Sequence, residues 1–210
     1  MIKRFFNNNI QFKKSVHSEA SFLTNDKYNI FMMLKGDIMD LFNIQVNEEK
    51  LHPNFINIYR DPDLRKTLSN WAIGFQDRDN KFVKEFQTTF NSSFWELYLH
   101  ACFNNLGFEI DYSYSSPDFV VKTRRRKLEM VIEAVGTRHA EGGLPEHERI
   151  SVLNEWLNKN INYTRKHEEI VHLATERIAN SINNKAIKYQ KSYSKLDHVK
   201  GLPFILAIGG

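Results

Sequence analysis

The sequence contains a single cysteine, Cys102, among its 210 residues. One thiol cannot form an internal disulfide or a cysteine-rich zinc site, and a position inside an apolar helical run is typical of a small buried hydrophobe. A chain of this length buries roughly 70% of its unfolded surface and needs no such cross-link to fold. Because a lone cysteine suits a reducing compartment, we expect a cytoplasmic protein.

The sequence also lacks long apolar runs. No stretch approaches the roughly 18 consecutive apolar residues that a membrane-spanning helix requires, and the mean hydropathy is negative. The basic residues near the N-terminus are not followed by the apolar segment of a secretory signal. We therefore expect a soluble protein without a membrane partner.

Acidic residues are only slightly fewer than basic ones, 25 against 29, and the isoelectric point is about 9.0. This balance permits a polyanionic partner such as nucleic acid without requiring one. Lysines recur near the C-terminus, where Lys188 is a candidate nucleic-acid contact. The run of Arg124, Arg125 and Arg126 fits either a solvated turn or a surface that holds a phosphate backbone.

The spacing of apolar residues predicts the secondary structure. Residues 1–78 have the pattern of several helices, and Asp61-Pro62 is typical of a helix start. After them we expect a long helix at 79–106, strands at 108–114, 118–122 and 128–135, a second long helix at 165–189 with Ile178 and Ile182 in its buried stripe, and a strand buried on both faces at 203–208. The pattern predicts an α/β fold, with an N-terminal helical subdomain over 1–78 and a core over 79–210.

The second and third predicted strands are too close in sequence for a crossover, so they should pair as an antiparallel hairpin. A turn centred between Arg125 and Arg126 places Asp118 directly opposite Glu133. Side chains alternate between the faces of a sheet, so both carboxylates would share one face with their Cβ atoms about 5 Å apart.

Two carboxylates at that spacing, away from bulk water, require either a shared proton or a bound cation. The hard oxygen ligands of Asp118, Glu133 and the Ala134 carbonyl suit Mg²⁺ or Mn²⁺. Such an ion acidifies a bound water and neutralises the charge that develops on a phosphoryl oxygen. The predicted chemistry is therefore the hydrolysis of a phosphodiester.

Pro117-Asp118, followed one hairpin later by Glu133-Ala134-Val135 and preceded by Glu96 on a predicted central helix, resembles the PD-(D/E)xK nuclease superfamily. The resemblance covers residues 81–210. It implies a restriction-endonuclease-like αβββαβ core, a mixed sheet flanked by helices, to which the N-terminal helical region is added. It also implies that Asp118 and Glu133, joined by Glu96, bind the metal of an endonuclease that cleaves DNA or, as the less favoured substrate, RNA.

Val135 stands where the motif of this superfamily has a lysine, which positions and activates the attacking water. Superfamily members with altered motifs can recruit another basic residue, and two lysines are candidates here. Lys185 lies on the predicted buried stripe of the second long helix, where an unpaired lysine is costly, and Lys122 lies on the acid-bearing face of the hairpin. Thr137 and Arg138 are weaker candidates.

Without a replacement for that lysine, the same fold would be a nucleic-acid-binding or protein-interaction module with little or no turnover. A homodimer or a larger complex is also open. The two classes of function differ in one property, because only the nuclease cleaves nucleic acid when a divalent metal is present.

Overall fold

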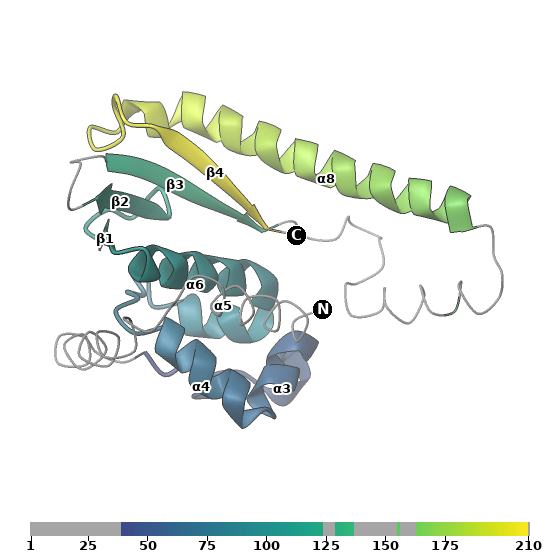
Figure 1. Cartoon of the computed structure of the whole chain (residues 1–210). Coiled ribbons are helices and arrows are strands. Elements are labelled where there is room, and N and C mark those ends of the chain that lie inside the picture. The colour runs from purple at the N-terminus through teal and green to yellow at the C-terminus, as the bar shows by residue number, and fades with distance from the viewer. Residues whose placement is uncertain (1–38, 124–128, 137–154, 156–162, 210) are drawn as a thin grey trace, which may run out of the picture. The chain divides into compact units, whose positions relative to one another are not determined.

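The computed structural model (Figure 1) describes residues 39–123, 129–136, 155 and 163–209. These residues belong to one compact unit that runs from Met39 to Gly210. None of the helices in the described part of the chain is long and apolar enough to cross a bilayer. The predicted contacts Arg124, Arg125 and Arg126, and the weaker candidates Thr137 and Arg138, lie outside the described residues.

A four-stranded mixed sheet with the strand order β1-β2-β3-β4 forms the centre of this unit. The strands are β1 (Phe108–Asp111), β2 (Phe119–Thr123), β3 (Glu129–Gly136) and β4 (Phe204–Gly209). The first three pair antiparallel, whereas β4 pairs parallel with β3. A parallel pair requires a crossover, and α8 (Tyr163–Lys191) lies in that connection. The predicted mixed α/β fold and its element order are confirmed from α6 (Phe90–Asn105) onward.

Helices cover both faces of the sheet, with α6 on one face and α8 on the other (Figure 1). On the α6 face, the rings of Phe103 and Phe119 meet edge to face with centroids 5.4 Å apart. On the α8 face, Val120, Val131 and Val199 form a buried cluster. The period-two alternation of β2 and β3 therefore supplies apolar side chains to both layers.

The helices before the sheet form an aromatic layer next to α6. They are α3 (Pro53–Tyr59), α4 (Pro62–Trp71) and α5 (Phe82–Thr88). The carboxylate of Asp61 accepts hydrogen bonds from the first turn of α4, which confirms the predicted helix start. The Phe55 ring packs edge to face on Phe86 at 6.0 Å, and the Trp71 ring lies 5.9 Å from Phe94 of α6. Aromatic contacts thus join the N-terminal helices to the helix beneath the sheet.

The single long helix predicted at 79–106 is wrong, because the structure has two helices separated at Thr89. The hydroxyl of Thr88 donates to the Lys84 carbonyl at 3.0 Å, and that of Thr89 donates to the Glu85 carbonyl at 3.1 Å. Hydrogen bonds of this kind compete with the helical ladder and bend helices. The apolar periodicity continues through the break, so the spacing alone could not reveal it.

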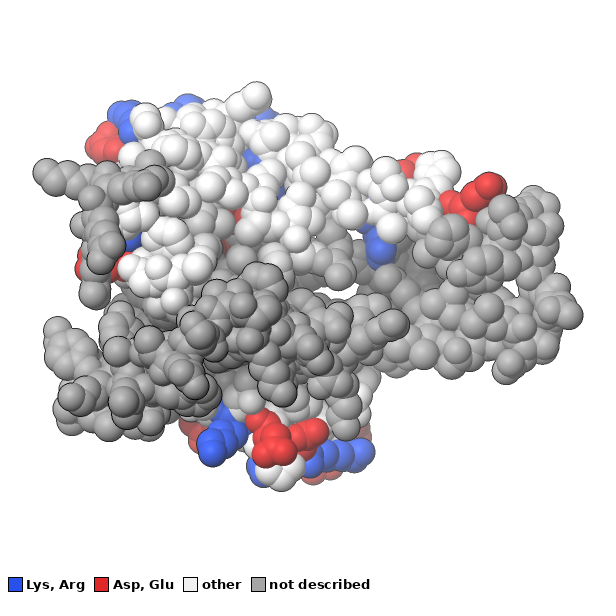
Figure 2. Space-filling model, in the orientation of Figure 1, with Lys and Arg blue, Asp and Glu red and all other residues white. Residues whose placement is uncertain are grey.

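Helix α8 does not bury the stripe that the sequence predicts. Ile178 and Ile182 are each 39% exposed, and Ile205 of β4 is 41% exposed, so β4 is not buried on both faces. The 29 residues of α8 span about 43 Å, whereas the six residues of β4 span about 20 Å. Much of α8 therefore extends beyond the strand that it covers, and the surface over α8 and β4 in Figure 2 is mainly uncharged.

Candidate active site at the Asp118 and Glu133 carboxylates

The hairpin pairs in the register that the sequence predicts. Phe119 lies opposite Ile132, and Val120 lies opposite Val131, which places Asp118, one residue before β2, beside Glu133. The Asp118 side chain turns to β3, where its Oδ2 accepts a hydrogen bond from the Ala134 backbone N–H at 2.7 Å. Asp118 is therefore fixed at the point where β2 begins.

Glu133 is the most deeply buried charged group near this point, with 1% of its surface exposed. Its Oε1 accepts from the Lys185 ammonium at 2.5 Å, the Tyr193 hydroxyl at 3.2 Å and the Lys188 ammonium at 3.4 Å. Its Oε2 is buried and has no hydrogen-bond partner among the described residues. One carboxylate oxygen is thus saturated, and the other retains the capacity to bind a cation or a donor.

Lys185 and Lys188 reach Glu133 because they are three residues apart on α8, so that both side chains project from neighbouring turns. Lys188 also lies 4.6 Å above the ring of Tyr193, from the short 3-10 helix η2 (Tyr193–Lys195) that follows α8. The structure thus brings Lys185, predicted as the substitute lysine, and Lys188, predicted as a nucleic-acid contact, to the same carboxylate. Val135, which stands where the resemblance to the nuclease superfamily leads one to expect a lysine, is buried.

The electrostatics of Asp118 show the proximity of a second negative charge. Its pKa is raised to about 6, first by burial and second by the charge of Glu133, while the Ala134 hydrogen bond and the charges of Lys185 and Arg78 act in the opposite direction. The opposing effects leave Asp118 easier to protonate than an exposed aspartate. A divalent cation at this place would reverse that effect.

Glu96 of α6 belongs to the same electrostatic group. Burial raises its pKa to about 8, with the Asp118 charge as the next cause, while the Arg78 guanidinium lowers it. The Glu133 charge is a smaller contribution in the same direction. The structure therefore couples the predicted helical glutamate electrostatically to both strand carboxylates.

Two polar residues of α6, Glu96 and His100, have different surroundings. The charge of Glu96 interacts with those of Asp118 and Glu133, whereas His100 is buried in a structural network. Burial lowers the pKa of His100 to about 4, so its Nδ1 accepts from the Tyr112 hydroxyl at 2.6 Å and its Nε2 donates to the Ile73 carbonyl at 3.1 Å. His100 thus ties α6 to the segments before α5 and after β1.

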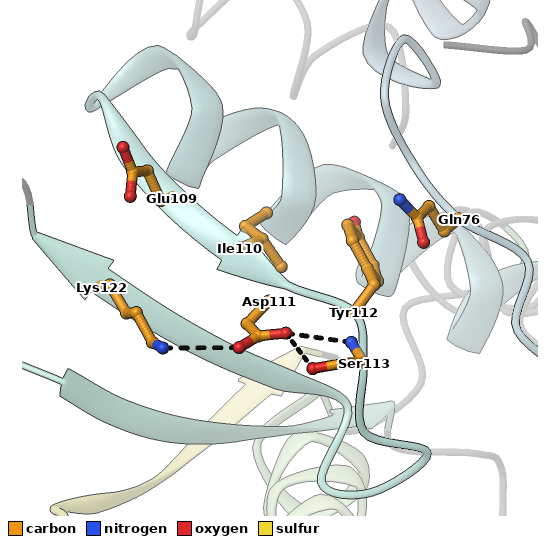
Figure 3. Close-up of a pocket in the computed structure, with 7 residues that line it drawn as sticks. All are labelled: Gln76, Glu109, Ile110, Asp111, Tyr112, Ser113 and Lys122. Atoms are coloured by element: carbon orange, nitrogen blue, oxygen red, sulfur yellow. Dashed lines mark hydrogen bonds and ion pairs between the residues drawn. The ribbon is translucent and has the colours of Figure 1, made fainter. Parts of the chain in front are cut away.

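Lys122 is not brought to the carboxylates. Its ammonium lies 3.4 Å from both Asp111 and Glu129, at the far end of the hairpin. The ion pair between Lys122 and Asp111 lines an open cavity of about 490 Å³ beside the edge strand β1 (Figure 3). The lining residues are Gln76, Glu109, Ile110, Asp111, Tyr112, Ser113 and Lys122. The cavity therefore lies apart from the candidate site.

Sequence reasoning missed Arg78, Tyr193 and His198. Tyr193 is buried and donates to Glu133, while Arg78 and His198 contact the loop that carries Asp118. Arg78 and His198 lie in irregular connecting segments and Tyr193 lies in the short helix η2, and none of these is long enough for a periodicity that would indicate a direction for the side chain. Of these three residues, Tyr193 could have been identified from the sequence, because it follows Lys185 and Lys188 closely.

The donor set at Asp118 and Glu133 fits a hard divalent cation. In a strand, the N–H and C=O of one residue point to the same neighbour, so the Ala134 carbonyl lies on the Asp118 side of β3, like its N–H. Among the described residues, no group of three or more His, Cys, Asp or Glu side chains is arranged to hold a metal ion. The inner ligands from the protein would therefore be Asp118, the unpartnered oxygen of Glu133 and the Ala134 carbonyl, completed by water.

No family model matches the chain, and no curated protein or solved structure matches it. The assignment of a function therefore depends on the geometry and chemistry of these residues.

Proposed function

We propose that the protein is a metal-dependent nuclease with a restriction-endonuclease-like core, which hydrolyses phosphodiester bonds in DNA in the cytoplasm. RNA is the second candidate substrate. The observation that carries the proposal is the Glu133 side chain, which is 1% exposed, holds Lys185 on one oxygen and leaves the other oxygen unpartnered among the described residues. A buried polar atom without a hydrogen-bond partner is rare in folded proteins, and a bound ion is one of the explanations for it.

In this proposal Lys185 supplies the ammonium group that is missing at Val135, where the superfamily motif has a lysine. Its ammonium lies 2.5 Å from Glu133, although it comes from α8 and not from β3. A lysine beside a metal-binding carboxylate is placed to donate a hydrogen bond to a phosphoryl oxygen or to the attacking water. The short contact with Glu133 supports Lys185 over Lys122 as the substitute lysine.

Each residue of the site would have a separate role in hydrolysis. Asp118 and Glu133 would hold Mg²⁺ or Mn²⁺, which acidifies a bound water and stabilises negative charge on a phosphoryl oxygen. Lys185, with its partly exposed side chain, would bind the attacked phosphate, and the more exposed Lys188 would bind a neighbouring one. The Tyr193 hydroxyl donates to Glu133 and holds the orientation of that carboxylate.

The test is cleavage of plasmid DNA, single-stranded DNA and RNA in Mg²⁺ or Mn²⁺, with EDTA as the control. Asp118→Asn should reduce the rate more than about 100-fold, since changes in groups that merely support a metal ligand already cost about 10- to 100-fold. The matched control is Asp197→Asn, because the Asp197 side chain is 95% exposed.

Metal-dependent cleavage that Asp118→Asn abolishes and Asp197→Asn preserves would support the proposal. Binding of nucleic acid without cleavage in any metal would instead indicate the binding module. Equal cleavage by wild type and Asp118→Asn would contradict the assignment of the site.

A further inference from the structure

The loop that carries Asp118 is held by a residue that the proposed mechanism does not use. Residues 112–118 connect β1 to β2 as turns and bends. The backbone carbonyls of such a loop must find hydrogen-bond donors outside a regular ladder. Three of them, those of Tyr114, Pro117 and Asp118, accept from one side chain, that of Arg78.

Arg78 is suited to this task because a guanidinium presents five N–H donors in a planar fork. Its Nη1 donates to the carbonyl of Tyr114 and, at 3.4 Å, to that of Pro117. Its Nη2 donates to the carbonyl of Asp118 at 3.1 Å. A single side chain therefore holds the loop at Tyr114 and again at Pro117 and Asp118.

A second group holds the same loop from another side. The Nε2 of His198 donates to the Ser116 carbonyl at 2.8 Å, and its ring stacks on that of Tyr114 with centroids 3.8 Å apart. His198 comes from the segment after η2, whereas Arg78 comes from the segment between α4 and α5. The loop is thus held by one residue that precedes it in the sequence, Arg78, and by one that follows it, His198. Of the two, Arg78 donates directly to the Asp118 backbone.

We propose that Arg78 is a positioning residue for the metal site, which holds the Asp118 backbone so that its carboxylate meets the Ala134 N–H and the cation. The inference rests on the proposed function. It gives a residue before position 81, in the part of the chain that the nuclease resemblance does not cover, a direct part in the site. A displacement of a ligand by about 1 Å is enough to weaken a preorganised site.

The experiment measures Mn²⁺ affinity by the electron paramagnetic resonance signal of free Mn²⁺, at a low temperature where circular dichroism shows each variant folded. Arg78→Lys keeps the charge and loses the fork, and Arg78→Gln loses both. Both variants should bind Mn²⁺ about 10- to 100-fold more weakly than wild type, the usual effect of removing a group that orients a ligand.

Ile58→Ala is the control for a merely structural effect, since Ile58 is fully buried in the aromatic layer at α3. This variant should unfold at a lower temperature and still bind Mn²⁺ like wild type. An Arg78→Lys protein that is folded and binds Mn²⁺ as tightly as wild type would overturn the inference and leave the nuclease proposal standing. A wild type whose Mn²⁺ binding is absent, or is unchanged by Asp118→Asn, would overturn the nuclease proposal itself.

A measurement on the wild type covers the case in which both Arg78 variants fail to fold. Nitrogen-15 spectra of the arginine side chains should show separate, slowly exchanging Nη resonances for Arg78, because its guanidinium is fixed by three carbonyls. A single averaged Nη resonance would mean a freely rotating group and would contradict the inference.

Discussion

At the residue scale, the candidate site depends on how Glu133 is satisfied. A carboxylate that is 1% exposed costs several kcal/mol to desolvate unless partners compensate it. Lys185, Lys188 and Tyr193 all compensate the same oxygen. Among the described residues Oε1 has three donors and Oε2 has none, and this difference distinguishes Glu133 from an ordinary buried ion pair.

Removal of Lys185 should weaken both stability and cleavage. Lys185→Met takes the shortest hydrogen bond from Glu133, so we expect a loss of about 1–3 kcal/mol in the free energy of unfolding. This is less than the 3–5 kcal/mol typical for breaking a fully buried pair, because Lys185 is 29% exposed and two donors remain. Urea unfolding measures the stability, and the cleavage assay should show little activity.

The control for Lys185→Met is Lys191→Met on the same helix, where the lysine is exposed. That variant should unfold within about 0.5 kcal/mol of wild type and cleave normally. If both variants behave alike, Lys185 has no special part in the site.

The raised pKa values of Asp118 and Glu96 predict a pH dependence of stability. Each group binds its proton more tightly in the folded state, with a pKa of about 6 against 3.8 for Asp118 and about 8 against 4.5 for Glu96. Stability in EDTA should therefore fall as pH rises through this range, since the folded state must release protons that the unfolded state has already lost. Mg²⁺ should restore stability most at the alkaline end.

Glu96→Gln isolates this effect from the other titrating groups. Relative to wild type, its thermal midpoint in EDTA should increase between about pH 5 and about pH 8, because the variant has no carboxylate to ionise there. Glu48→Gln, at an exposed glutamate, is the control and should show no such trend. A constant difference between Glu96→Gln and wild type would contradict the burial of a titrating Glu96.

At the scale of elements, the hairpin was the most predictable part. Strand periodicity and the short basic connection define the register of β2 and β3, which places Asp118 and Glu133 together. The break at Thr89 and the exposure of Ile178 could not be predicted, because the apolar spacing is the same in a continuous, fully covered helix. The contacts of Arg78 were also invisible, since a side chain in an irregular segment has no periodicity to indicate its direction.

The close packing of α6 on β4 depends on a glycine. A Cβ at Gly209 would lie 2.5 Å from the Trp95 ring, whereas one at Gly136 would lie 3.2 Å from Ser92. Trp95 cannot move away freely, because its indole N–H donates to the Ala207 carbonyl at 2.8 Å. Gly209→Ala should therefore cost about 1–3 kcal/mol through overpacking, and Gly136→Ala should cost less. Urea unfolding of the two variants checks the order.

At the scale of the whole molecule, the described helices of residues 39–78 lie in the same compact unit as the sheet. The sequence predicts a subdomain boundary after residue 78. Arg78 and the Trp71 contact with Phe94 connect the helical layer to the sheet and its loop. These connections favour one cooperative folding unit, which is a measurable property.

Phe55→Ala tests this cooperativity in the full chain. Phe55 is fully buried in α3 and packs on Phe86, so the substitution should cost about 3–5 kcal/mol. In a single cooperative unit, native-state hydrogen exchange should show the opening free energies of α4 and β3 falling together. A fall confined to α3 and α4, with β3 unchanged, would instead support two folding units divided near residue 78.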